Sequence, residues 1–446
     1  MSERWNNRSV FRLLWPLIIE QILAVTMGAA DTVMVSFVGE FAVSGVNIVD
    51  NINNLLLIAF AALCTGGAVV VSQYLGRRDT KKSAAAARQL VCIVVFASLV
   101  IMMITIALRR PIIRFFYGKV ETDVMNGAAL YFLITALSYP FLALYNANAA
   151  LFRASGNSRS PMKIALLVNV MNIGGNAVFI FVLRFGVAGA AVSTLASRVA
   201  ASLVTLYMLV KSRGPISLSG ITRTRLSRSM IHSILNVGIP SGLESSMFQI
   251  GRLLTQRIFT TFGTSAMAGN AIAGVINSFS FMPGMAFGMA LLTIVGQCIG
   301  AGDYRAAKRE TARIMKLAYM TLAVLSVLIF MFIDPLINLF KLSDVAHAYA
   351  KSFLRVHCIS MMIGWPMSFA LPNALRAAGD SRYVMVVASV SMWTVRVSAA
   401  YLLSYVFGLG PLGVWLAMGA DFISRGSFYL YRWVKGAWQE KKVIED

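Results

Sequence analysis

Twelve apolar segments follow one another along this chain of 446 residues. Each is about 20 residues or longer, which is enough for an α-helix to cross the hydrocarbon core of a bilayer. In lipid, backbone polar groups must be bonded within the protein, so that only helices and closed barrels span a membrane. We therefore predict an all-α integral membrane protein with twelve transmembrane helices. The segments are residues 12–39, 44–75, 86–108, 124–152, 162–183, 186–210, 230–262, 267–300, 314–340, 347–375, 383–407 and 411–431.

The composition supports the same class of protein. Hydrophobic residues make up 58% of the chain and charged residues 13%, a balance that excludes soluble enzymes, disordered scaffolds and secreted disulfide modules. The cysteines show no C-x-x-C spacing, and the histidines form no cluster, so that no disulfide or metal site is expected apart from a site for Na+. These residues are Cys64, Cys92, Cys298, Cys358, His232, His347 and His357.

The basic residues behind the net charge of +22 follow a regular pattern along the chain. Most Lys and Arg residues lie at the two ends of the chain and in alternate loops, and the intervening loops hold few. By the positive-inside rule, both termini are predicted to be cytoplasmic. The basic residues form no stripe interleaved with aromatic residues, so we expect contact with membrane lipids and no binding of nucleic acid.

An internal repeat organises the whole chain. A shift of 224 residues places Pro16 on Pro240, and a shift of 223 aligns the loop 151–159 with 374–382. The 224-residue shift also aligns Glu20 with Glu244, Gly39 with Gly263, Ala42 with Ala266, Gly45 with Gly269, Asn53 with Asn277, Gln73 with Gln297 and Gly76 with Gly300. Because six helices is an even number, both halves enter the membrane in the same sense, which predicts two six-helix lobes related by a parallel pseudo-two-fold repeat. The predicted parts are an N-terminal lobe (1–210), a cytoplasmic linker (211–229), a C-terminal lobe (230–435) and a cytoplasmic tail (436–446).

Short motifs recur at the ends of these segments. They comprise Pro16 and Gly28-Ala-Ala-Asp in the first segment, Gln-x-x-Gly at 73–76 and 297–300, the two Arg-Ala-x-Gly-[Asn/Asp]-Ser-Arg loops, and Gly-Val-Ala-Gly-Ala-Ala from Gly186. In this order, and over essentially all twelve segments, they resemble the multidrug and toxic compound extrusion (MATE) family.

The resemblance implies a secondary antiporter that exports organic compounds, often cationic or amphipathic, in exchange for Na+ or H+. It implies no cofactor beyond the coupling ion, small-molecule substrates, and a monomer with many membrane passes in the bacterial inner membrane. The alternatives are a lipid-linked precursor flippase of the wider superfamily and another secondary transporter, such as a major-facilitator permease. An enzyme is not expected, because no His/Asp or metal cluster is evident.

Acidic residues within the spans are candidates for function, because burying a charge in hydrocarbon is costly. Asp31 is taken as the acid in the outward half of the N-terminal lobe and is predicted to bind the coupling cation or proton. Glu20 lies on the same helix face, about three turns away. It is predicted either to line a cavity or to extend to the interface as a charged side chain.

The fifth segment carries three asparagines, at positions 169, 172 and 176. Their amide oxygens, with Thr194 and the Asp31 carboxylate, make an all-oxygen set suited to a hard cation. Archaeal family members resemble this set, with a second aspartate where this chain has Asn176, so either Na+ or a single-acid proton site remains open. Interhelical amide bonds that only pack the helices are the alternative.

In the C-terminal lobe, Glu244 resembles a functional glutamate of Na+-coupled bacterial members, and an ion pair to a neighbouring residue is its alternative. Arg252, Arg257 and Arg396 are expected to find acidic or carbonyl partners. Asp421 and Arg425 are four residues apart on one helix and are predicted to pair.

Methionines and prolines within the spans are the last candidates for a role in substrate binding or in helix movement. Methionines repack easily and suit a substrate chamber, for which Met282, Met285 and Met289 are candidates, with Arg396 and Glu20 as further chamber or gating residues. Prolines within spans predict kinks at Pro16, Pro140, Pro283 and Pro366. A bend at Pro16 is expected to couple cation binding to movement of the first helix.

Overall fold

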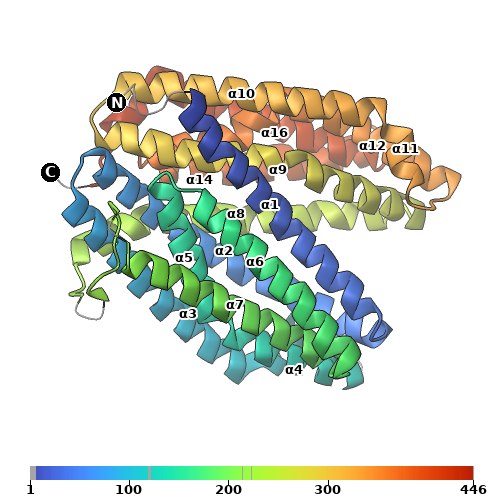
Figure 1. Cartoon of the computed structure of the whole chain (residues 1–446). Helices are drawn as coiled ribbons and strands as arrows, with labels where there is room; N and C mark the ends of the chain where they lie inside the picture. Colours follow the sequence, from blue (N-terminus) through green and yellow to red (C-terminus); the bar gives the residue numbers. More distant parts are fainter. Residues whose placement is uncertain (1–6, 119–121, 213, 222–223, 445–446) are drawn as a thin grey trace. The chain divides into compact units, whose positions relative to one another are not determined.

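The computed structural model describes residues 7–118, 122–212, 214–221 and 224–444, which form helices and no strand (Figure 1). The predicted all-α class is therefore confirmed. Residues 1–6 of the predicted N-terminal lobe and 445–446 of the predicted tail lie outside the described residues. The described chain divides into two compact units, Trp15–Gly238 and the residues up to Leu14 together with those from Ile239.

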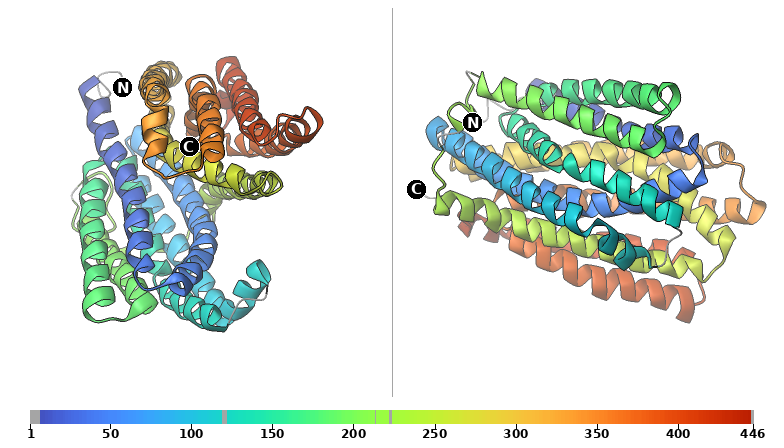
Figure 2. Two further views of the ribbon diagram at one scale, coloured as in Figure 1. Left: turned by 90° about the vertical axis from the view of Figure 1, so that its right-hand side faces the viewer. Right: turned by 90° about the horizontal axis from the view of Figure 1, so that it is seen from below.

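The unit Trp15–Gly238 is built mainly from the first six spans. α4 and α5 form one span that bends by 45° just before Pro140. α5 packs against α2, α3 and α7, and α6 runs beside α7 in both views of Figure 2. The helices are α1 (Asn7–Ser36), α2 (Glu40–Gly76), α3 (Thr80–Tyr117), α4 (Thr122–Leu137), α5 (Tyr139–Ala154), α6 (Arg159–Asn176), the π-helical η1 (Ala177–Val182) and α7 (Gly186–Val210).

The second unit repeats this order with more interruptions. Its tenth span bends by 61° where α12 meets Pro366, and its eleventh contains two π-helical segments. The elements are α8 (Arg228–Thr260), α9 (Thr264–Gly300), α10 (Tyr304–Met331), α11 (Ile333–Asn338), α12 (Asp344–Ile363), η3 (Pro366–Ala370), α13 (Leu371–Ala377), α14 (Ser381–Ser391), η4 (Met392–Val397), α15 (Ser398–Tyr401), η5 (Leu402–Val406), α16 (Leu412–Lys435) and η6 (Ala437–Glu440).

Hydropathy separates two of the spanning helices from the others. Among the described residues, eight helices are long and apolar enough to cross a membrane, or ten if each bent pair is one span. The remaining long helices, α8 and α16, carry ionisable residues within their length, including Glu244 and Arg252 in α8 and Asp421 and Arg425 in α16. With these two helices the described chain has the predicted twelve.

The repeat is visible in the local geometry of each unit. Asp79 caps α3 by accepting a hydrogen bond from a backbone N–H, and Asp303 caps α10 in the same way. Gly45 brings α2 close to the backbone of α4, and Gly269 brings α9 close to the backbone of α12. A Cβ at Gly269 would lie 2.8 Å from a carbonyl oxygen, so the close approach requires glycine.

The predicted linker, residues 211–229, folds against its own unit. Ile216 and Leu218 are buried. The side-chain amide of Gln89 in α3 donates to the carbonyl oxygen of Arg225 at 2.7 Å. The described part of this segment is thus packed chain rather than a loose connection.

Bends are present at Pro140 and Pro366, whereas the kinks at Pro16 and Pro283 stay predictions. α1 and α9 continue through Pro16 and Pro283. α3 instead has an unpredicted kink at Leu108, where φ is −107° and ψ is 16°, three residues before Pro111. The sequence prediction ended this helix at the kink, because the residues that follow are basic.

Candidate functional site

Three helices bring the predicted N-terminal polar residues together. Asn176 of α6 donates its amide to the Asp31 carboxylate of α1 at 2.5 Å. Asn172, one turn earlier in α6, donates to the hydroxyl of Thr194 in α7 at 3.3 Å. The hydroxyl of Ser193 donates to the backbone carbonyl of Asn172 at 2.8 Å. The structure thus groups Asp31, Asn172, Asn176 and Thr194 in one cluster.

The amide oxygens of this cluster are the feature that matters for binding. Asn172 and Asn176 are fully buried, and Asn169 is 6% exposed. The side-chain oxygen of each of the three has no hydrogen-bond partner. Buried acceptors are normally satisfied, and leaving one unpaired costs free energy. Unpaired oxygens beside a carboxylate offer ligands for a cation or for a protonated group.

Asp50 of α2 is a functional candidate that the sequence prediction missed. It accepts a hydrogen bond from Tyr131 of α4 at 3.2 Å, and its charge acts on Asp31. Arg198 of α7 donates to the hydroxyl of Ser138 at 2.6 Å, and its positive charge interacts with the carboxylates of Asp50 and Asp31. The prediction that Asp31 is the one acid in this half of the unit was wrong. Asp50 was overlooked because it stands near the start of an apolar segment, although it lies within the second span.

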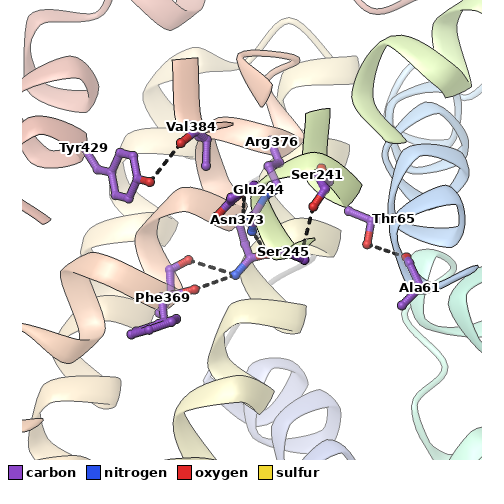
Figure 3. Close-up of polar contacts among 11 residues, drawn as sticks. Ala61, Thr65, Ser241, Glu244, Ser245, Phe369, Asn373, Arg376, Val384 and Tyr429 are labelled. Carbon is purple, nitrogen blue, oxygen red and sulfur yellow. Dashed lines mark hydrogen bonds and ion pairs between the residues drawn. The ribbon is translucent and has the colours of Figure 1, made fainter. Parts of the chain in front are cut away.

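Equivalent ion pairs occur in the two units. Glu20 of α1 accepts from Arg153 of α5 at 2.7 Å. Glu244 of α8 accepts from Arg376 of α13 at 2.6 Å, and Arg376 also contacts the side-chain oxygen of Asn373 at 2.8 Å (Figure 3). All four charged side chains are less than a fifth exposed. The repeat offsets align both the acids and the arginines, so the pairing was detectable from the sequence, but the prediction did not include it.

These pairs change how the two glutamates are interpreted. Glu20 is buried and paired, which neither of its predicted alternatives described. Glu244 adopts the ion pair that was its alternative to a coupling role. A carboxylate that already has a guanidinium partner binds a second cation only if the arginine moves away.

A second cluster of buried charges lies between α16 and η4. The guanidinium groups of Arg425 and Arg396 approach the same oxygen of Asp421, at 3.4 Å and 3.8 Å. That oxygen has no hydrogen-bond partner, whereas the other oxygen of Asp421 accepts from Ser391 at 2.7 Å. The predicted approach of Arg425 to Asp421 is present, but it lacks hydrogen-bond geometry.

The remaining predicted residues are dispersed. Met282 is buried at 3% exposed, Met285 is 40% exposed, and Met289 is intermediate. Arg252 and Arg257 of α8 have exposed side chains. Within the part of the chain that the structure describes, no group of His, Cys, Asp and Glu is arranged to hold a metal ion, and the four cysteines are free.

The all-helical spans, the repeated six-helix plan and the buried polar clusters fit the class of membrane transporters. The family model MatE matches residues 16–178 and again 240–402, so the chain belongs to the MatE family. The two matches are offset by the 224 residues of the internal repeat.

Related proteins match over nearly the whole length. An uncharacterized transporter, YisQ, from Bacillus subtilis is 29% identical over 97% of this chain and 95% of its own. A probable multidrug resistance protein, NorM, from Thermotoga maritima is 26% identical over 98% and 94%.

Solved structures share the fold at lower identity. A crystal structure of MATE in the bent conformation has a TM-score of 0.90 at 20% identity, over 98% of this chain and 96% of its own. A MOP superfamily transporter from Pyrococcus furiosus has a TM-score of 0.90 at 21% identity, over 97% of this chain and 96% of its own. At these levels of sequence identity, the structural similarity shows that the chains share a fold.

Proposed function

We propose that this chain is a cation-coupled secondary antiporter that exports organic, cationic or amphipathic compounds by alternating access of its two halves. Na+ or H+ is the coupling ion, and Asp31 is the group that takes it up. The observation that carries the proposal is the pair of unpaired amide oxygens of Asn172 and Asn176 in the cluster that holds Asp31. The names of the multidrug resistance relatives support export of drug-like compounds.

The charge of the cluster suits an exchangeable cation. Asp31 and Asp50 together carry two negative charges when ionised, and Arg198 balances one of them. A remaining negative charge with neutral oxygen ligands attracts a monovalent cation without requiring a tightly held metal. Na+ and H+ both meet this description, because either neutralises the remaining carboxylate charge.

α1 is attached in a way that supports coupling. The Asp31–Asn176 bond and the Glu20–Arg153 pair are polar contacts of α1 to α6 and α5. Cation uptake at Asp31 competes with the Asn176 contact, and so alters how the outer part of α1 is held.

The test is export by the full-length protein in proteoliposomes, with Na+ and pH gradients imposed separately. The Asp31→Asn variant is expected to lose gradient-driven export under whichever gradient drives the native protein. Asn keeps the shape of Asp and is cheaper to bury, so folding is retained. Asp334→Asn, which removes an acid from the short helix α11, is the matched control and should export normally.

Export at the native rate by Asp31→Asn under the same gradient contradicts the role of Asp31. Glu244, once released from its pair with Arg376, then becomes the leading coupling residue. Native export that responds to neither gradient contradicts the antiport proposal itself.

A further inference from the structure

The two buried arginines of the second unit have more hydrogen-bonding capacity than their surroundings use. Arg396 is 6% exposed and Arg425 is 2% exposed. Two nitrogens of each guanidinium are buried without a hydrogen-bond partner: Nε and Nη1 of Arg396, and Nε and Nη2 of Arg425. An unpaired buried donor on a charged group is among the costliest features of a protein interior. Two of these nitrogens, Nη1 of Arg396 and Nη2 of Arg425, lie at ion-pair distance from Asp421 without a hydrogen bond, and the two Nε groups have neither, so the site retains donors for a further acceptor.

The charges of this cluster do not balance. Asp421 provides one negative charge against the two guanidinium groups, at distances beyond a normal hydrogen bond. Arg252 of α8 adds a further positive charge that acts on Arg396. Buried charges are normally paired, so the excess positive charge favours an anion.

Aromatic rings surround the guanidinium groups. The ring centroid of Phe248 lies 5.0 Å from the Arg396 guanidinium and 5.6 Å from that of Arg425. Phe369 lies 4.6 Å from the Arg425 guanidinium. Rings packed over guanidinium faces hold the cations in place and leave the N–H edges to bind a ligand. These edges are the part of a guanidinium that binds carboxylates.

The backbone is irregular at the same place. Arg396 lies in the π-helical segment η4, and Phe369 lies in the π-helical segment η3. π-Helical turns are rare and occur frequently at functional sites. η5 has a counterpart in η1 of the first half, but the residues equivalent to η4 belong to the regular helix α6.

A single inserted residue accounts for η4. Arg153 aligns with Arg376 at an offset of 223 residues, whereas Gly189 aligns with Gly413 at an offset of 224. At both glycines a Cβ would lie less than 3 Å from backbone atoms of a neighbouring segment. The second half therefore holds one residue more than the first between these markers. A π-helical turn accommodates one additional residue, and the chain has Arg396 within that turn.

We propose that Arg396 and Arg425, held by Phe248 and Phe369, form a binding site for a monovalent anion in the second unit. The anion accepts hydrogen bonds from the guanidinium nitrogens that have no partner, and Asp421 competes with it for the same positive charge. Two sources supply this chemistry: an inorganic anion such as chloride, or the carboxylate of an organic compound. The second source rests on the transport function proposed above.

The site is tested by thermal unfolding of the purified full-length protein in detergent, without any gradient. The probes are chloride titrated against isethionate, which carries no carboxylate, at constant ionic strength, and benzoate titrated against the neutral amide benzamide in a chloride-free buffer. A saturable rise in the unfolding temperature measures binding, because a ligand of the folded state stabilises it. We expect chloride or benzoate to stabilise the protein, and benzamide to have no effect.

Four variants separate an anion site from a structural ion pair. Arg396→Gln should weaken binding about tenfold or more, because it removes charge-assisted hydrogen bonds. Arg257→Gln removes the same charge from an exposed position of α8 and should bind the anion as the native protein does. Asp421→Asn removes the competitor and should tighten binding about tenfold. Arg396→Lys, which keeps the charge with fewer N–H groups, should bind with intermediate affinity.

The outcomes decide both the site and its ligand. Stabilisation by chloride alone assigns an inorganic anion, and stabilisation by benzoate assigns an organic carboxylate. No saturable effect of either anion on the native protein overturns the proposal. Equal weakening in Arg396→Gln and Arg257→Gln, or weaker binding in Asp421→Asn, overturns it as well. Because no transport is measured, these results are independent of the Asp31 export test.

Discussion

Removing the carboxylate of Glu244 should destabilise the second unit far more than removing an exposed acid. Its pair with Arg376 is 2.6 Å long, and the two side chains are 11% and 14% exposed. Breaking a buried pair by removing one partner costs about 3–5 kcal/mol, because the remaining charge is left uncompensated. In Glu244→Gln that charge belongs to Arg376, which retains the side-chain oxygen of Asn373 as a neutral partner. We therefore expect Glu244→Gln to lower the free energy of unfolding by about 3 kcal/mol, the lower end of this range.

The assay is thermal unfolding of the full-length protein in detergent, read as a double-mutant cycle. For a folded unit of about 200 residues, a loss of about 3 kcal/mol lowers the unfolding temperature by roughly 6–12 °C. The double variant Glu244→Gln/Arg376→Met, which leaves neither charge buried alone, should recover most of the loss. Glu20→Gln in the first unit should behave like Glu244→Gln, because its pair with Arg153 is equivalent in length and burial.

The reasoning is refuted if Glu244→Gln unfolds at the native temperature, or if the double variant is as unstable as the two single losses added together. The first result would mean that the pair makes no net contribution. The second would mean that each side chain acts through contacts other than their pair.

The other predictions concern single positions. Gly269→Ala should lower stability by about 1–3 kcal/mol, because its Cβ would meet the backbone of α12, whereas Gly274→Ala on the same helix meets nothing within 4 Å and should be neutral or stabilising in the same unfolding assay. Arg78→Gly should raise the unfolding temperature, because Arg78 has a left-handed φ of 64° where the second half has Gly302. The hydrogen bond from Lys351 of α12 holds the pKa of Asp334 below its ordinary value of 3.8. The stabilising contribution of the ionised Asp334 is therefore present at neutral pH and is lost as the pH falls through the lowered pKa. The small difference in unfolding temperature between Asp334→Asn and the native protein should therefore disappear in acid, and a difference that grows below pH 3.8 would contradict this assignment.

The sequence predicted the helices well, because lipid imposes a strong constraint on them. A span of about 20 apolar residues is visible in composition alone. The helix ends were less accurate where charge continued within a helix, as at Leu108, where basic residues follow a kink. The bends at Pro140 and Pro366 were predicted from proline, whereas α1 and α9 continue as helices through Pro16 and Pro283.

The candidate sites were predicted unevenly for a similar reason. Asp31 and the asparagines of α6 were found because polar residues in an apolar helix are conspicuous. Whether an acid has a basic partner depends on which helices meet. Glu20 and Glu244 were therefore assigned functions without knowledge of Arg153 and Arg376. The repeat contained that information, since it aligns acid with acid and arginine with arginine.

The two halves use one helical plan, but their charged clusters have opposite polarity, and only the cluster of the second half is fully buried. The first half groups two acids, Asp31 and Asp50, with one arginine. The second groups Arg396 and Arg425 with one acid. At the 224-residue offset the positions equivalent to the two N-terminal acids are Thr255 and Gly274, and those equivalent to the two C-terminal arginines are Asn172 and Ala201.

Neither cluster is therefore a remnant of the repeat. Each arose by substitution on a shared frame, whereas the caps at Asp79 and Asp303 and the two glutamate–arginine pairs were kept in both halves. Features kept in both halves serve folding, because each half must fold by the same rules. The charged clusters have opposite signs in the two halves. If such a cluster were needed only for stability, both halves would contain the same one, so we infer that these clusters serve binding. The proposed cation site of the first half and the proposed anion site of the second half are therefore both built from residues that only one half contains.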